Sequence, residues 1–108
     1  MPAGSEDEAV RFYAGVLDLE HVPKPEHLAS RGGCWFRSGS VELHLGVEDG
    51  FRPARKAHPA FLVANLRLLR ARLEAESVEV VVDTQIEGRD RFYVSDPFGN
   101  RLELIGEG

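Results

Sequence analysis

Two glutamates occupy matching places in two short polar/apolar segments of this chain. Glu42 lies in the run Val-Glu-Leu-His-Leu, and Glu103 lies in the run Leu-Glu-Leu-Ile. The alternation predicts a strand in each case, with the carboxylate between two apolar residues. Glu42 follows the helix-start residue Ser5 by 37 residues, and Glu103 follows Asn65 by 38. We therefore predict a tandem duplication whose two carboxylates share a cavity. The alternative is that each carboxylate faces solvent on a half-buried strand.

Each copy contains a predicted amphipathic helix. Ser5 and Glu8 have the spacing of a capping box, and Asn65 is predicted to cap the second helix. Both helices carry an apolar stripe with helical spacing. The stripes are Ala9, Phe12, Tyr13 and Val16 in the first copy, and Leu66, Leu69 and Leu73 in the second. Pro23 and Pro25 are expected to break regular structure after the first helix.

The strands follow the helices in the same order in both copies. They are predicted over residues 34–37 and 41–45 in the first copy, and over 60–63, 78–82, 91–95 and 102–105 in the second. The second copy thus reads strand, helix, strand, strand, strand. The first copy is expected to lack its opening strand, because the corresponding residues would precede Met1. Either the start of the chain was assigned too late, which we favour, or the two copies differ.

Composition excludes several classes of function. The 108 residues suit a single compact domain, 1–108. A net charge of −5 argues against nucleic acid or an anionic membrane as a partner. No apolar run approaches the roughly 20 residues that span a bilayer, and the N-terminus has no pattern of a secretory signal. The single cysteine, Cys34, cannot form an intrachain disulfide, so we expect a cytoplasmic protein.

Four stretches resemble the vicinal oxygen chelate superfamily, which includes glyoxalase I, bleomycin-resistance proteins and extradiol dioxygenases. Residues 8–19 are similar to the family's first helix, with Asp18 where glycine is usual. Residues 41–43 are similar to the end of a first module, and residues 58–63 to the opening strand of a second. Residues 96–104, Asp-Pro-Phe-Gly-Asn-Arg-Leu-Glu-Leu, closely match the motif that ends the fold.

The resemblance spans essentially the whole chain and implies an α+β fold. Two tandem βαβββ modules, at about residues 1–50 and 57–108, would form an open, cup-like mixed sheet. The first strand of module one would be missing or truncated. Fold alone does not identify the reaction, because members of one fold differ in chemistry.

The resemblance also implies a metal site. In metal-dependent members the ligands come from the first and last strands of each module, which here gives Glu42, His58 and Glu103, with the fourth position upstream of Met1. These ligands suit zinc, nickel, iron or manganese. An open coordination position would let a substrate chelate through two oxygens, with Glu103 also catalytic. The alternative for His58 is an inert surface histidine.

His44 lies on the same face of its predicted strand as Glu42. This position suits a substitute metal ligand, a catalytic acid or base, or a substrate contact. An ordinary histidine in the cavity wall is the alternative.

Strand alternation also predicts a cavity wall. Phe36, Phe92 and Val94 are expected to face the core, so their neighbours face the cavity. The predicted substrate-binding residues are Trp35, Arg37, Arg91 and Tyr93. An aromatic wall with two guanidinium groups suits a planar or acidic small molecule. Trp35 as a plain core residue is the alternative.

These expectations indicate a divalent-metal-dependent lyase, isomerase or dioxygenase that acts on a small oxygen-chelating molecule. The rival is a metal-free protein that binds a small molecule or antibiotic with the same cup. A third possibility is a folded but inactive fragment. We expect a homodimer, because pairing across a twofold axis would cover open sheet edges.

Overall fold

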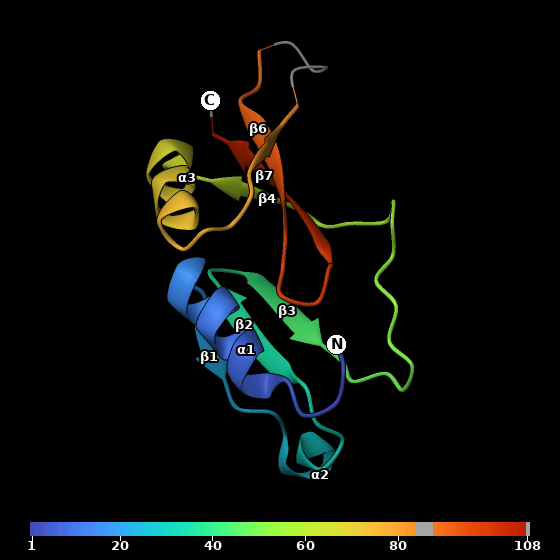
Figure 1. The fold of residues 1–108 in the computed structure, drawn as a ribbon. Coiled ribbons are helices and arrows are strands. Elements are labelled where there is room, and N and C mark those ends of the chain that lie inside the picture. The colour runs from blue at the N-terminus through green and yellow to red at the C-terminus, as the bar shows by residue number, and fades with distance from the viewer. Residues whose placement is uncertain (84–87, 108) are drawn as a thin grey trace. The chain divides into compact units, whose positions relative to one another are not determined.

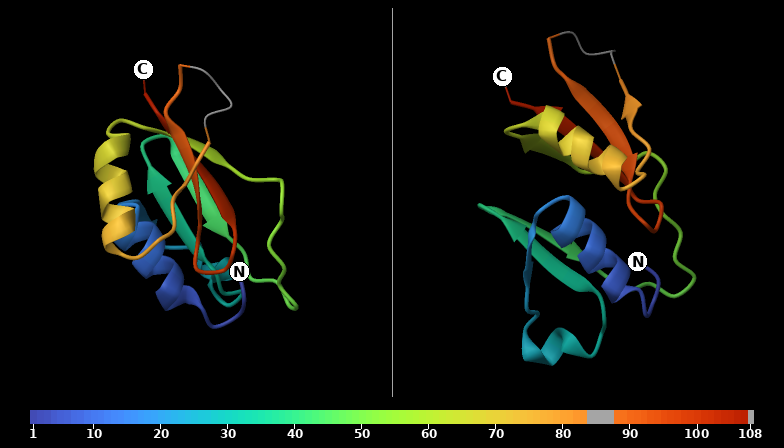
Figure 2. Two further views of the ribbon diagram at one scale, coloured as in Figure 1. Left: turned by 45° about the horizontal axis from the view of Figure 1, so that its top comes forward. Right: turned by 60° about the vertical axis from the view of Figure 1, so that its left-hand side comes forward.

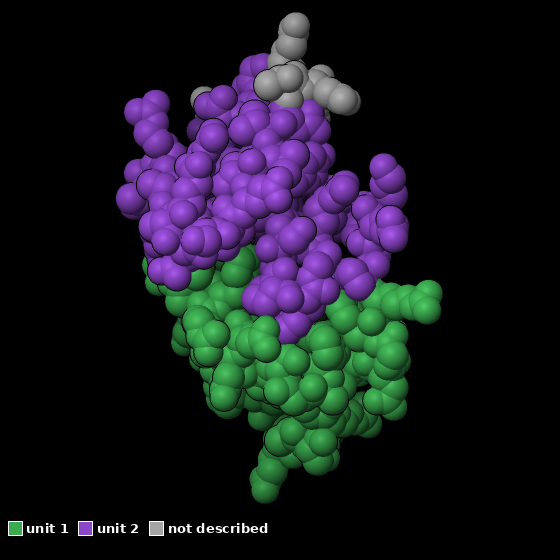
Figure 3. Space-filling view, viewed as in Figure 1, with its two compact units in different colours: residues 1–52 green, residues 53–108 purple. Residues whose placement is uncertain are grey.

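Each half of the chain packs a helical segment against a sheet of its own (Figures 1 and 2). The computed structural model describes residues 1–83 and 88–107. The chain forms two compact units, Met1–Arg52 and Pro53–Gly108, which we call unit 1 and unit 2 (Figure 3). Helices and a β-sheet occur in both units, so the predicted α+β class is confirmed.

Unit 1 is a three-stranded antiparallel sheet with a helix against one face (Figure 2). The strand order is β1-β2-β3. Its elements are α1 (Glu6–Val10), the π-helix η1 (Arg11–Val16), β1 (Glu20–Val22), α2 (Glu26–Ala29), β2 (Cys34–Ser38) and β3 (Val41–Leu45). The predicted helical stripe is buried, and Phe36 from β2 is fully covered. The Tyr13 ring packs between the rings of Phe12 and Phe36, at centroid distances of 5.0 and 5.3 Å.

Two local predictions for unit 1 are wrong. Ser5 precedes α1, but its side chain makes no capping hydrogen bond. The helix instead begins with three acidic residues, which the helix dipole favours at an N-terminus. Pro25 does not end regular structure: it directly precedes α2, because a φ of −52° is compatible with a helix entry.

Unit 2 is a four-stranded mixed sheet of order β4-β7-β6-β5, with α3 against it. β4 pairs with β7 in parallel, and the other pairs are antiparallel. Its elements are β4 (Ala60–Val63), α3 (Leu66–Ala75), β5 (Val81–Val82), β6 (Arg91–Ser95) and β7 (Arg101–Gly106). The predicted strand 78–82 is shorter than expected, since only its last two residues pair with β6. Leu69 and Leu73 of α3 are buried with Phe92, Val94, Leu102 and Leu104 of the sheet.

Two side chains fix the ends of elements in unit 2. Asn65 caps α3 as predicted, because its side-chain oxygen accepts a hydrogen bond from the Leu68 N–H at 3.1 Å. Asp96 holds the β6–β7 turn by accepting from the backbone N–H groups of Phe98 and Asn100, at 2.9 and 2.8 Å. The closing family motif thus builds the turn that returns the chain into β7.

In the described part of unit 1 no strand corresponds to β4, but Met1 makes the same backbone hydrogen bond as the last residue of β4. In unit 2 the Glu107 N–H donates to the Val63 carbonyl at 3.1 Å. In unit 1 the Glu48 N–H donates to the Met1 carbonyl, also at 3.1 Å. Met1 therefore holds the position that Val63, the last residue of β4, holds in unit 2.

No helix within the described ranges has the length and apolar character needed to span a membrane. The cytoplasmic location stays a prediction.

Candidate functional site

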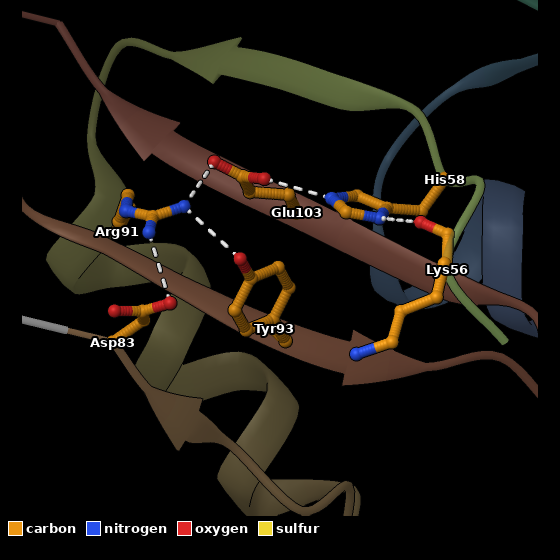
Figure 4. A network of polar contacts seen from close by, with 6 residues as sticks. All are labelled: Lys56, His58, Asp83, Arg91, Tyr93 and Glu103. Carbon is orange, nitrogen blue, oxygen red and sulfur yellow. Dashed lines mark hydrogen bonds and ion pairs between the residues drawn. The ribbon is translucent and has the colours of Figure 1, made fainter. Parts of the chain in front are cut away.

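Glu103 is a buried carboxylate with a partner on each oxygen (Figure 4). It lies in the middle of β7, and its side chain is 11% exposed. Its Oε1 is 2.8 Å from Nε2 of His58, and its Oε2 accepts a hydrogen bond of 2.7 Å from Nη1 of Arg91. Burying a charge is costly unless it is paired and hydrogen-bonded. Both conditions are met here.

His58 is held in a defined orientation at the entry to β4. Its Nδ1 lies 2.7 Å from the backbone carbonyl of Lys56. A carbonyl can only accept, so Nδ1 must carry a proton and donate. Nε2 is therefore the ring nitrogen that contacts Glu103. A backbone carbonyl on the far ring nitrogen is the usual way in which a protein orients a metal-binding histidine.

Arg91 links three side chains on the same face of the sheet (Figure 4). Besides Glu103, its Nη1 donates to the Tyr93 hydroxyl oxygen at 3.1 Å, and its Nη2 is 2.9 Å from an Asp83 carboxylate oxygen. The hydrogen bond to Glu103 is the main cause that raises the pKa of Arg91. The pKa of Glu103 is lowered, first by the hydrogen bond with His58 and then by those from Arg91, against an opposing effect of desolvation. The ionised form of Glu103 is therefore favoured.

Tyr93 connects this network to a second guanidinium. The Arg101 guanidinium carbon lies 5.1 Å from the centroid of the Tyr93 ring. Both residues line a cavity of about 360 Å³ beside β5 and β6. Sequence reasoning missed Arg101, although the alternation that places Glu103 on this face also places Arg101 there, two residues earlier.

The predicted residues of unit 1 form a group on the face of β2 and β3 opposite the buried Phe36. The rings of Trp35 and His44 are stacked, with centroids 3.7 Å apart and an interplanar angle of 3°. Nε2 of His44 is 3.8 Å from an oxygen of Glu42. Arg37 forms an exposed ion pair with Glu20 at 3.2 Å. Histidine, carboxylate and indole are therefore adjacent within unit 1.

Hydrogen-bond register gives Glu103 a different counterpart from the one expected. Glu48 and Glu107 hold equivalent positions, because each donates its backbone N–H to the segment just before the first helix of its unit. His44 lies four residues before Glu48, and Glu103 lies four residues before Glu107. The structural counterpart of Glu103 is therefore His44, and Glu42 corresponds to the position two residues before Glu103.

Antiparallel pairing supports the same equivalence. Trp35 of β2 lies directly opposite His44 of β3. Tyr93 of β6 lies directly opposite Glu103 of β7. Each unit thus sets an aromatic residue across from the candidate ligand, on the same face of the sheet.

The structure brings some predicted residues together and leaves one grouping untested. His58, Arg91, Tyr93 and Glu103 form one network in unit 2. Phe36, Phe92 and Val94 lie in the core as predicted, and Trp35 is on the opposite face from Phe36. Within the residues described, no three histidine, cysteine, aspartate or glutamate side chains form a cluster suited to a metal ion. The convergence of Glu42 with His58 and Glu103 stays a prediction.

Comparisons with known proteins give consistent matches. Residues 1–104 match the model of the glyoxalase/bleomycin resistance protein/dioxygenase superfamily. A crystal structure of a glyoxalase family protein from Bacillus anthracis is 46% identical, with a TM-score of 0.96, covering 100% of this chain and 88% of that one. Lactoylglutathione lyase from Agrobacterium tumefaciens is 24% identical, with a TM-score of 0.73, covering 98% and 88%.

A more distant structure shares the fold alone. The fosfomycin resistance protein FosX from Listeria monocytogenes is 15% identical, with a TM-score of 0.75, covering 94% of this chain and 84% of that one. No curated protein matches the chain in sequence.

Proposed function

Because the chain belongs to the glyoxalase/bleomycin resistance protein/dioxygenase superfamily, we propose that it binds a divalent metal ion through His58 and Glu103. The bound metal would act on a small molecule that chelates it through two oxygens. The observation that carries this proposal is the contact of 2.8 Å between His58 Nε2 and Glu103 Oε1, with His58 Nδ1 fixed by a backbone carbonyl.

The two side chains have the chemistry and spacing of adjacent metal ligands. Zinc binds imidazole nitrogen and carboxylate oxygen at about 2.0–2.2 Å. Two such ligands at a tetrahedral or octahedral angle have donor atoms roughly 3 Å apart, by the same bond lengths. Nε2 and Oε1 need only a small separation from their present 2.8 Å. In the present contact the ionised carboxylate can only accept, so Nε2 donates to it. A metal that replaced this Nε2 proton would bind the freed lone pair, while Nδ1 kept its own proton.

Unit 1 offers two candidates for a further ligand. The sequence repeat favours Glu42, and the hydrogen-bond register favours His44. His44 with His58 and Glu103 would make two histidines and one carboxylate, the set typical of non-haem iron oxygenases. Glu42 in place of His44 would make a set suited to zinc, nickel or manganese. Metal preference therefore depends on which of the two side chains binds.

The surrounding residues have definite tasks in this proposal. A bound divalent metal supplies Lewis acid chemistry, polarising a substrate oxygen. Arg91 holds Oε2 of Glu103 and so turns Oε1 toward His58. Tyr93 accepts a hydrogen bond from Arg91, which leaves the phenol proton free to be donated to an oxygen of the substrate.

One observation favours a metal-free binding protein instead. Arg91 already supplies a fixed positive charge to Glu103 at 2.7 Å. A carboxylate neutralised by arginine gains less from a metal cation than an unpaired carboxylate does. In this second candidate function the chain would hold a small molecule without transforming it.

Zinc binding by metal-stripped protein tests the proposal. We would use calorimetry together with the fluorescence of Trp35, the single tryptophan, which is stacked on His44. Glu103→Gln and His58→Ala should each weaken zinc binding by at least about 100-fold, more than the 10–100-fold typical of outer-shell residues. Glu74→Gln, on the exposed face of α3, is the matched control and should change nothing.

The same titration separates the two candidates in unit 1. If His44 binds zinc, His44→Ala weakens binding and zinc changes the Trp35 emission of the wild type. If Glu42 binds zinc, Glu42→Gln produces the larger loss. A wild-type protein that binds no zinc, nickel, iron or manganese would refute the metal-dependent function and leave the metal-free one.

A further inference from the structure

Arg101 is a guanidinium without a carboxylate partner in the described part of the chain. Its guanidinium carbon lies over the face of the Tyr93 ring, 5.1 Å from the ring centroid. Arg91, on the same face of the sheet, differs because its charge is neutralised by Asp83 and Glu103. Arg101 is also half-buried, so part of its hydration is already lost. A half-buried, unpaired cation favours an anionic ligand.

The cavity beside Arg101 is of a size for a small organic molecule. Its volume is about 360 Å³, within the range of ligand pockets. It is lined by Glu79, Val81, Tyr93, Val94, Ser95 and Arg101. The lining therefore combines apolar surface with a few polar groups that can orient a ligand.

Two residues that line this cavity with Arg101 carry hydroxyl groups. Ser95 lies directly opposite Arg101 in the β6–β7 pairing. The Tyr93 oxygen accepts a hydrogen bond from Arg91, so its own proton is available to a ligand. Guanidinium groups bind carboxylate and phosphate through two parallel N–H donors, and a phosphonate presents oxygens of the same kind as phosphate. One guanidinium and two hydroxyl groups can therefore donate hydrogen bonds to all the oxygens of a carboxylate or phosphonate head.

We infer that Arg101, Tyr93 and Ser95 form a subsite for the anionic head of a small organic acid, a carboxylate or a phosphonate. The subsite names the substrate class of the proposed function. It rests on that function only for the step in which the other oxygens of the ligand bind a metal at Glu103 and His58. Arg101 and Glu103 are two residues apart on one face of β7, a separation of roughly 7 Å along a strand. A molecule of a few carbon atoms spans that distance, with its head at Arg101 and its remaining oxygens near Glu103.

Glu79 opposes this binding and sharpens the test. Glu79 lines the same cavity, and a like charge near the subsite weakens an anion's affinity. Removing that charge should therefore strengthen binding, whereas removing the charge of Arg101 should weaken it. A subsite for a neutral ligand would not respond with opposite signs to these two changes.

The experiment is a titration followed by nuclear magnetic resonance in the presence of a chelator. Acetate and methylphosphonate are the anionic probes, and acetamide is the neutral probe of the same size as acetate. We expect millimolar binding of at least one anion, with the largest shifts at the amides of Ser95 and Arg101, and no binding of acetamide. The two anions distinguish a carboxylate from a phosphonate preference.

Variants then assign the binding to the subsite. Arg101→Met should weaken anion binding by at least about tenfold, as expected for a lost charge-assisted hydrogen bond. Arg101→Lys should keep part of the affinity, which shows that a change in folding is not the cause. Glu79→Gln should strengthen binding about threefold, the size of a screened charge interaction. Arg67→Met, which removes an exposed guanidinium outside this cavity, should have no effect.

Three results would overturn the inference: no anion bound by the wild type, equal binding of acetamide, or unchanged affinity in Arg101→Met. Because no metal is present, the outcome does not depend on zinc binding. Loss of zinc binding with anion binding intact would refute the metal-dependent function alone.

Discussion

Replacing Glu103 by glutamine should lower the free energy of unfolding by about 2 kcal/mol at pH 7. Each oxygen of the charged carboxylate has one hydrogen-bonding partner, at 2.8 Å for His58 and 2.7 Å for Arg91. Hydrogen bonds to charged groups contribute roughly 1.5–3 kcal/mol. The glutamine carbonyl can still accept from one partner, so about one such bond is lost. For a chain of this length the melting temperature should fall by roughly 8–16 °C.

The pH dependence gives this prediction a second, independent test. The pKa of Glu103 lies below its ordinary value of 4.5 in the folded protein, first because of the hydrogen bond with His58. The folded state therefore binds fewer protons than the unfolded state just below pH 4.5. The stability contributed by the ionised carboxylate is fully present above that pH and is lost as pH falls through the lower folded pKa. The difference between wild type and Glu103→Gln should shrink accordingly.

Urea unfolding followed by circular dichroism, with chelator present, measures both effects. Glu42→Gln is the matched control, since Glu42 occupies the similar sequence run but has a side chain 54% exposed. It should change the free energy of unfolding by no more than about 0.5 kcal/mol. Equal losses in the two variants, or a loss for Glu103→Gln that persists in acid, would refute the assignment of Glu103 as a buried, ionised anchor.

Four further predictions concern packing, capping, stacking and assembly. Leu73→Ala should cost about 2–5 kcal/mol in urea unfolding, because Leu73 is fully buried on α3; a loss below about 1 kcal/mol would contradict that packing. Asn65→Ala should cost about 1 kcal/mol in the same assay, since the hydrogen bond from the Leu68 N–H is lost. His44→Ala should shift the Trp35 emission to longer wavelength by exposing the indole to water, and an unchanged spectrum would argue against the stacked pair. The homodimer stays a prediction: light scattering should give twice the chain mass of 12.0 kDa, and a mass of 12.0 kDa at micromolar concentration would contradict it.

Local patterns were sufficient for most of the elements. The predicted bounds of β3, β4 and β6 agree with the structure, because strand alternation and neighbouring turn residues act within a few positions. Asn65 caps α3 for an equally local reason. Ser5 shows where local reasoning fails, since its hydroxyl does not adopt the capping contact that its spacing allows.

The sequence by itself determined the family, the strand that carries Glu103 and the face on which Glu103 lies. Only the tertiary structure decided which residue of unit 1 corresponds to it, because register depends on hydrogen bonds between segments distant in sequence. His44 and Glu42 share a face, so the sequence cannot separate them, whereas the Glu48–Met1 contact does. The partners of Arg91 and Arg101 were decided in the same way. Among the residues that the structure describes, Arg91 forms ion pairs with Asp83 and Glu103, whereas Arg101 forms none.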